Sequence, residues 1–274
     1  MFDAAIALAP QSGNTFTGAS HPAWNNMVGP FGGVTAATAL NSVLQHPERL
    51  GEPVALTVNF AAALAPVPFT VEARPARTNR STQHWVIEFF QPNAEGEMQT
   101  VLTATAVTAV RRDTWGSNNM PMPVVPVPED LPVLLLKRME WLNRYEVRPI
   151  IGGVSQRWDG QSQTDDPATA SLSQFWMKDS PERPLDFASL TAMADHFFPR
   201  IMLRRATLVP VGTVSITVYF HASAAELRDT GTGYLLGQAR AQAFCNGFFD
   251  QTAQLWNQAG RLLATTHQTV YYKN

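Results

Sequence analysis

The chain has 274 residues, of which 45% are hydrophobic and 15% are charged, with a formal net charge of −2. This length is enough for one large domain or two modest ones, each with its own core. The low charge excludes a disordered chain, and the sequence contains no long basic run that would support nucleic-acid binding.

The N-terminal segment and the cysteine content both favour a cytoplasmic protein. Residues 1–9 carry Asp3 where a signal peptide needs a basic residue, and no segment is apolar for long enough to span a membrane. The single cysteine, Cys245, cannot form an internal disulfide, which is typical of a reducing compartment. We expect no membrane partner, and Cys245 as a small buried residue.

The first half of the chain predicts one helix followed by an antiparallel sheet. A run of small residues over 31–41 predicts the helix, and the alternating segment 54–60, VALTVNF, predicts a strand. Further strands are expected over 69–77, 82–91 and 97–111, with a hairpin turn at 93–96. Prolines and polar residues over 114–130 then predict an extended linker.

The second half repeats this order. A helix is predicted over 185–195, and the strand 214–220, VSITVYF, lies 160 residues after its counterpart in the first half. Strands over 234–244, 248–258 and 261–272 complete the unit. We predict an N-terminal unit at 1–112, a linker at 113–134 and a C-terminal unit at 135–274, joined edge to edge into one continuous sheet.

The predicted helices have faces of small residues. Ala188, Thr191, Ala192 and Asp195 fall at positions i, i+3, i+4 and i+7 of the second helix. Small side chains let a helix lie close inside a curved sheet, which favours an α+β hotdog arrangement. A generic α+β sandwich is the alternative.

On these features the chain resembles the acyl-CoA thioesterase II family of double-hotdog enzymes. In the first half the resemblance depends on residues 21–25 and on Phe-Gly-Gly at 31–33. In the second half it depends on Asp195 of the helix, Thr213 opening the next strand and Gln268 of the last strand. The resemblance implies hydrolysis of acyl-CoA, an activity of fatty acid metabolism, by a water that these three residue types orient.

The first half offers an internal control. The repeat aligns Asn41 with Asp195, Pro53 with Thr213 and Val107 with Gln268, so the first unit lacks all three groups. This pattern favours one working site per chain, although drift on a structural surface would produce it too.

Thioester hydrolysis requires a positioned water, a proton acceptor and donors for the carbonyl oxygen. Asp195 can accept the proton if burial raises its pKa; a helix-terminal capping residue is the alternative. The unpaired N–H groups at Gly32 and Gly33 are candidate oxyanion donors, unless they form only a tight turn into a helix.

The remaining expectations concern ligands. Arg200, Arg204 and Arg205 are candidates for CoA phosphate contacts, with a solvated loop as the alternative. No histidine has metal-ligand spacing, so we expect no metal and no cofactor. A homo-oligomer is expected. The alternative functions are a hotdog enoyl-CoA hydratase or dehydratase, which would need His196 to point inward, and a non-catalytic acyl-CoA-binding protein.

Overall fold

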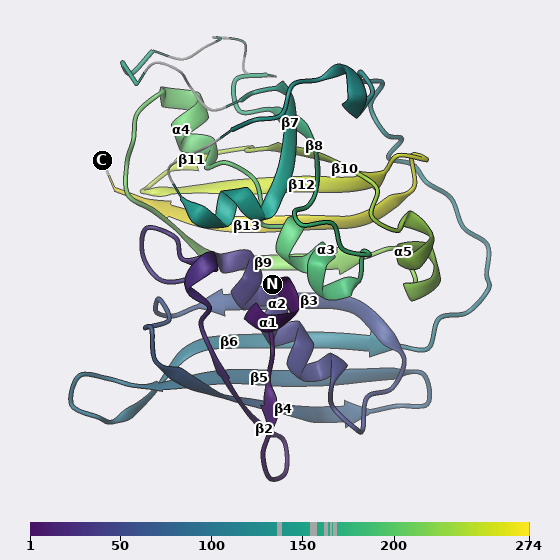
Figure 1. Ribbon diagram of the computed structural model, residues 1–274. Helices are drawn as coiled ribbons and strands as arrows, with labels where there is room; N and C mark the ends of the chain where they lie inside the picture. Colours follow the sequence, from purple (N-terminus) through teal and green to yellow (C-terminus); the bar gives the residue numbers. More distant parts are fainter. Residues whose placement is uncertain (136–138, 154–157, 162–163, 165, 167–168, 274) are drawn as a thin grey trace.

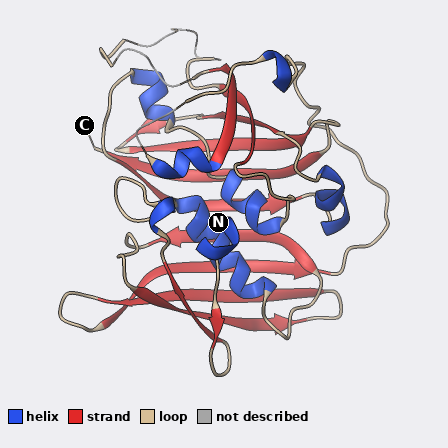
Figure 2. Cartoon of the chain, in the orientation of Figure 1, coloured by secondary structure: helices blue, strands red, loops and turns tan. Residues whose placement is uncertain are grey.

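A computed structural model describes residues 1–135, 139–153, 158–161, 164, 166 and 169–273. Its framework is one antiparallel sheet with the strand order β1-β2-β4-β5-β6-β3-β9-β13-β12-β10-β8-β7, and β11 pairs with β12. Helices α2 and α3 lie side by side on the concave face, in front of the central strands (Figure 1; helices are blue in Figure 2). One continuous sheet with both predicted helices on one face confirms the expected architecture.

The predicted helix-plus-sheet unit occurs twice. The first half contains α2 (Gly32–Leu44), β3 (Glu52–Phe60), β4 (Pro68–Thr78), β5 (Thr82–Pro92) and β6 (Met98–Ala109). The second contains α3 (Phe187–Met193), β9 (Val211–Phe220), β10 (Leu235–Arg240), β12 (Phe248–Asn257) and β13 (Leu262–Tyr272). The strands form because β-branched and aromatic residues alternate with polar ones, so one face of each strand is buried against a helix.

Other elements were not predicted. They are the helices α1 (Phe2–Ala5), α4 (Arg200–Arg205) and α5 (Ala224–Thr230), the strands β1 (Ala9–Pro10), β2 (Thr15–Ala19), β7 (Tyr145–Ile151), β8 (Ser173–Asp179) and β11 (Phe244–Cys245), and the 3₁₀ turns η1 (Pro22–Trp24), η2 (Pro128–Asp130) and η3 (Glu140–Arg144). Cys245 is exposed, so the expectation of a buried cysteine is wrong. Its strand, β11, is only two residues long and pairs with β12.

The two halves join where β3 pairs with β9. Thr57 lies directly opposite Thr217, and their hydroxyl oxygens are 3.0 Å apart. These residues are separated by the 160-residue offset of the repeat. A pseudo-two-fold axis therefore passes through this pair, and the chain is built like a symmetric dimer of two fused units.

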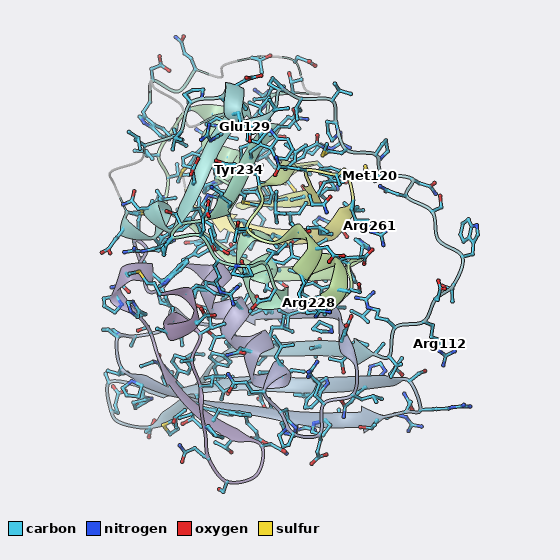
Figure 3. All side chains as sticks on the ribbon, turned by 45° about the vertical axis from the view of Figure 1, so that its right-hand side comes forward. Arg112, Met120, Glu129, Arg228, Tyr234 and Arg261 are labelled. Atoms are coloured by element: carbon cyan, nitrogen blue, oxygen red, sulfur yellow. The ribbon has the colours of Figure 1, made fainter. Side chains whose placement is uncertain are left out.

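The segment between the halves is extended but bound to the surface. It runs along the outside of the molecule from Arg112 past Met120 to Glu129 (Figure 3). The indole N–H of Trp256 donates to the Met120 carbonyl at 3.0 Å, and that of Trp176 donates to the Pro126 carbonyl at 2.8 Å. The linker thus covers part of the convex face of the second half.

The main core lies between the helices and the concave face of the sheet. In α2 the side chains of Ala36, Ala37, Ala39 and Leu40 are completely buried. Their small size lets α2 pack against both the sheet and α3, as the sequence predicted. Among the described residues, no helix combines the length and apolar character needed to cross a membrane.

Candidate active site

The three residues predicted to orient a water lie together. One carboxylate oxygen of Asp195, Oδ1, accepts a hydrogen bond of 2.9 Å from Nε2 of Gln268. The Thr213 hydroxyl donates to Oε1 of the same amide over 3.5 Å. Gln268 therefore bridges the carboxylate and the hydroxyl. Asp195 lies two residues beyond the end of α3, because the helix ends at Met193 and not at residue 195 as predicted.

A β-bulge aims Thr213 at Gln268. The pairing of β9 with β13 shifts between Ser215, opposite Thr269, and Thr213, opposite Val270. Without the extra residue, strand alternation would turn Thr213 to the convex face, because Ser215 faces away from the buried residue Ile216. The bulge therefore brings the hydroxyl to the concave side. Alternation alone could not have revealed this from the sequence.

The first half of the chain supplies the other wall of the site. Phe31, the N-cap residue of α2, provides no side-chain hydrogen bond, so the first turn of the helix is not capped locally. The Gly33 N–H instead faces the Asp195 carboxylate and lowers the pKa of that group. A Cβ on Gly32 would lie 2.8 Å from Oδ2 of Asp195, closer than Cβ atoms normally approach, so a larger residue here would displace the carboxylate. The site is therefore a seam between the two halves.

The two predicted oxyanion donors lie at this seam, because Gly32 and Gly33 open α2 beside Asp195. Their roles as donors to the substrate carbonyl stay predictions.

The surroundings of Asp195 make it a base suited to neutral pH. Burial raises the pKa of its carboxyl from 3.8 to about 7, although the hydrogen bonds from Gln268 and Gly33 lower that pKa in part. Asp195 therefore gains or loses a proton near physiological pH. A general base is most effective when its pKa lies close to the working pH.

His196 does not take part in this arrangement. Its ring lies among aromatic rings, 4.5 Å from Tyr145, 5.4 Å from Trp141 and 5.9 Å from Phe175 between centroids. Burial lowers the pKa of His196 to about 3, and its Nδ1 has no hydrogen-bond partner among the described residues. The side chain is a neutral packed histidine and cannot supply a proton at neutral pH.

Arg200 is wrong as a candidate for phosphate contacts. Its side chain is fully buried, and its Nη1 donates to the Ser173 hydroxyl at 2.6 Å and to the Ser171 carbonyl at 3.1 Å. This guanidinium ties α4 to the sheet and has no exposed atom for a ligand. Arg204 is half-buried and Arg205 is exposed, so both remain predicted contacts.

Strand register identifies one residue that the sequence did not suggest and corrects another. Gln251 on β12 lies directly opposite Gln268 on β13, and its side chain is 2% exposed. In the first half Trp85 takes the place of Gln251, since it lies opposite Ala106. Ala106 is the counterpart of Gln268, because Leu56 pairs with Ala106 as Ile216 pairs with Gln268. The predicted counterpart, Val107, is wrong by one residue.

Comparison with known structures identifies the class of fold. A hot dog fold protein of unknown function from Alicyclobacillus acidocaldarius is 45% identical, with a TM-score of 0.90 over 100% of this chain and 98% of that one. A putative thioesterase II from Thermobifida fusca is 19% identical, with a TM-score of 0.84 over 100% and 97%. An acyl-CoA thioesterase II, TesB2, from Mycobacterium marinum is 17% identical, with a TM-score of 0.77 over 100% and 98%. The fold is a double hotdog.

Family models define the chain further. The model of the acyl-CoA thioesterase N-terminal domain matches residues 20–109, and the model of the C-terminal domain matches residues 121–272. The chain therefore belongs to the acyl-CoA thioesterase family. No curated protein matches it in a sequence search.

Proposed function

We propose that the protein hydrolyses acyl-CoA thioesters to a free acid and CoA, with a water held by Asp195, Gln268 and Thr213. One observation carries this proposal: the Gln268 amide bridges the Asp195 carboxylate and the Thr213 hydroxyl, on the concave face of the sheet. A carboxylate and two neutral polar groups can hold a water without a competing positive charge. Family membership supports the same reaction.

The reaction follows from these groups. The water oxygen attacks the thioester carbonyl carbon while Asp195 accepts a water proton, and the carbonyl oxygen becomes negatively charged. When the carbonyl re-forms, the carbon–sulfur bond breaks and the thiolate of CoA leaves. The proton held by Asp195 then passes to that thiolate. Burial of Asp195 favours both transfers. With a pKa of about 7, the carboxylate can accept a proton from the water and then release it to the thiolate at neutral pH.

The test is release of free thiol from a panel of acyl-CoAs of different chain lengths. Asp195→Asn preserves the shape and removes the basicity, so we expect kcat to fall by roughly 10²–10⁴. Asp229→Asn, at an exposed position on α5, is the matched control and should leave kcat unchanged. Full activity in Asp195→Asn would contradict the proposal, as would a wild-type protein that releases no thiol from any substrate.

The surroundings of His196 argue against a hydratase or dehydratase. That chemistry would pair Asp195 with a histidine that exchanges protons, whereas His196 is packed and has a pKa of about 3. A non-catalytic acyl-CoA-binding protein differs in one measurement, since it would bind the panel without releasing thiol. Phosphate contacts at Arg204 and Arg205, a cytoplasmic location and a homo-oligomer remain parts of the proposal.

An Arg204→Ala, Arg205→Ala double variant tests the proposed phosphate contacts. A true phosphate contact binds substrate and transition state alike, so its loss should raise KM with little change in kcat. An unchanged KM in the double variant would remove both arginines from the proposed CoA contacts.

A further inference from the structure

The groups that hold Asp195 leave the reaction without an identified donor for the carbonyl oxygen. Nε2 of Gln268 donates to Asp195, and its Oε1 accepts from Thr213. The Gly33 N–H faces Asp195 and lowers the pKa of its carboxyl. These groups position the base. Negative charge develops on the carbonyl oxygen in the transition state, and a donor placed there lowers the barrier.

Gln251 has an amide that is not engaged elsewhere. It is the cross-strand neighbour of Gln268, and strand alternation places both side chains on the concave face. Among the described residues, Gln251 has no hydrogen-bond partner. Its amide atoms are nevertheless not closed off from solvent.

We infer that the Gln251 side-chain amide is a catalytic residue, whose Nε2–H donates a hydrogen bond to the thioester carbonyl oxygen. The inference rests on the proposed thioesterase function and adds to it the group that receives the developing charge. The Gln251 side chain is almost entirely buried next to Gln268, yet its amide has no partner within the part of the chain that the structure describes, so it is free to donate to a substrate carbonyl that reaches this part of the site.

The first half of the chain supports this inference, because it shows which side chain the fold accepts at the equivalent position when no site is present. Its counterpart, Trp85, is 1% exposed, and its indole N–H donates to the Thr108 hydroxyl at 3.2 Å. The fold therefore accepts a large, internally satisfied side chain here. An amide with no internal partner is not a requirement of the hotdog unit.

The experiment compares Gln251→Leu with Gln254→Leu in the full-length protein. Gln254 lies on the same strand but on the opposite face, where it accepts a hydrogen bond of 3.2 Å from Gln238. Loss of an oxyanion donor lowers kcat by roughly 10²–10³, and we expect this fall in Gln251→Leu with KM within about threefold of wild type. Gln254→Leu should retain wild-type kcat. Gln251→Asn, which keeps a shorter amide, should recover part of the loss.

A pH profile tests whether the Gln251 side chain lies close to the base. Gln251→Glu places a second carboxylate next to Gln268, the partner of Asp195, so the acidic limb of the kcat/KM profile should move to higher pH. A kcat within threefold of wild type in Gln251→Leu, or an unmoved profile in Gln251→Glu, would overturn the inference, and the proposed function would stand if Asp195→Asn is still impaired. Absence of thiol release by the wild-type protein would refute the proposed function itself, and the inference with it.

Discussion

The two helices of the repeat begin in different ways. At the start of α3, Asp186 caps its own helix by accepting a hydrogen bond of 2.8 Å from the Ser189 N–H. At the start of α2, Phe31 offers no such cap, and Asp195 from the other half lies there instead. The two helix starts occupy equivalent places in the pseudo-symmetric arrangement. Only the start of α2 lacks a local cap, and a residue of the opposite half lies there. That difference is what makes one seam suitable for chemistry.

The two halves of the sheet also differ in the side chains that they place beneath the helices. Both halves have the same bulge, since the pairing shifts after Pro53 in β3 as it does after Thr213 in β9. The first half places Pro53, Trp85 and Ala106 where the second half places Thr213, Gln251 and Gln268. One backbone thus supports either a packed core or a polar site. The side chains alone decide which.

The largest expected difference between the halves comes from Trp85 and Gln268. Trp85→Ala removes a buried indole, so we expect the free energy of unfolding to fall by about 3–5 kcal/mol with kcat of the folded protein unchanged. Gln268→Ala should do the reverse and lower kcat roughly 10–100-fold with little loss of stability. Denaturant unfolding and thiol-release assays on both variants measure this. A larger loss of kcat in Trp85→Ala than in Gln268→Ala would contradict the assignment of one working seam.

Gly32→Ala tests whether α2 belongs to the site. The added Cβ would meet Oδ2 of Asp195 at 2.8 Å and push the carboxylate away from Gln268. A displacement of about 1 Å in a reacting group can lower a rate by about 10², and we expect kcat to fall by that order. Gly116→Ala, at a linker position with open space around it, is the control. Equal activity in the two variants would remove α2 from the site.

The pH dependence follows from the raised pKa of Asp195. Only the ionised carboxylate accepts a proton, so kcat/KM should rise about tenfold per pH unit up to a pH of about 7 and then level off. An acidic limb centred near the ordinary aspartate pKa of about 4 would show that burial does not control this group.

The same shift predicts a cost in stability. The native state binds the Asp195 proton up to a pH of about 7, whereas the unfolded chain releases it near pH 3.9. Stability therefore falls as pH rises between these values. Asp195→Asn removes the cost, which is about 4 kcal/mol for a pKa difference of about three units. Its melting temperature should therefore match wild type near pH 4 and exceed it by roughly 10 °C at pH 8, at about 2–4 °C per kcal/mol. A constant difference across this range would contradict the linkage.

Thr213→Val should have the smallest effect. The hydrogen bond from its hydroxyl to Gln268 is long, at 3.5 Å, and Gln268 keeps its bond to Asp195 without it. We expect kcat to fall by roughly 2–10-fold, the equivalent of one modest hydrogen bond. Steady-state kinetics measure this, and a loss as large as that of Asp195→Asn would instead assign the hydroxyl a direct role with the water.

Much of the fold could be read from the sequence because the repeat preserves hydrophobic alternation at a fixed offset. Helices α2 and α3 and the long strands of both units follow from local patterns, whereas α1, α4 and α5 do not. The seven-residue strands β7 and β8 at one end of the sheet could not, since they contain few alternating positions and depend on neighbours in the sheet. Buried Arg200 was missed for a related reason: charge patterning does not show where a guanidinium finds carbonyl partners.

The site was predicted by residue type and not by geometry. Asp195, Thr213 and Gln268 could be named, but the contact of Asp195 with Gly32 joins residues from different halves, and no local signal reports it. The role of the bulge at Thr213 and the position of Gln251 both depend on strand register. A shift of one residue, as in the alignment of Val107, exchanges the two faces of a strand.

The contact between Asp195 and the start of α2 also has a consequence for folding. Each half can form hairpins from neighbouring segments, but Gly32 and Asp195 meet only after β3 has paired with β9. Such pairings between distant segments form slowly, because loop closure must precede the contacts that stabilise them. Enzymatic activity should therefore return later than strand content during refolding. The recovery of activity would then report when the two halves dock.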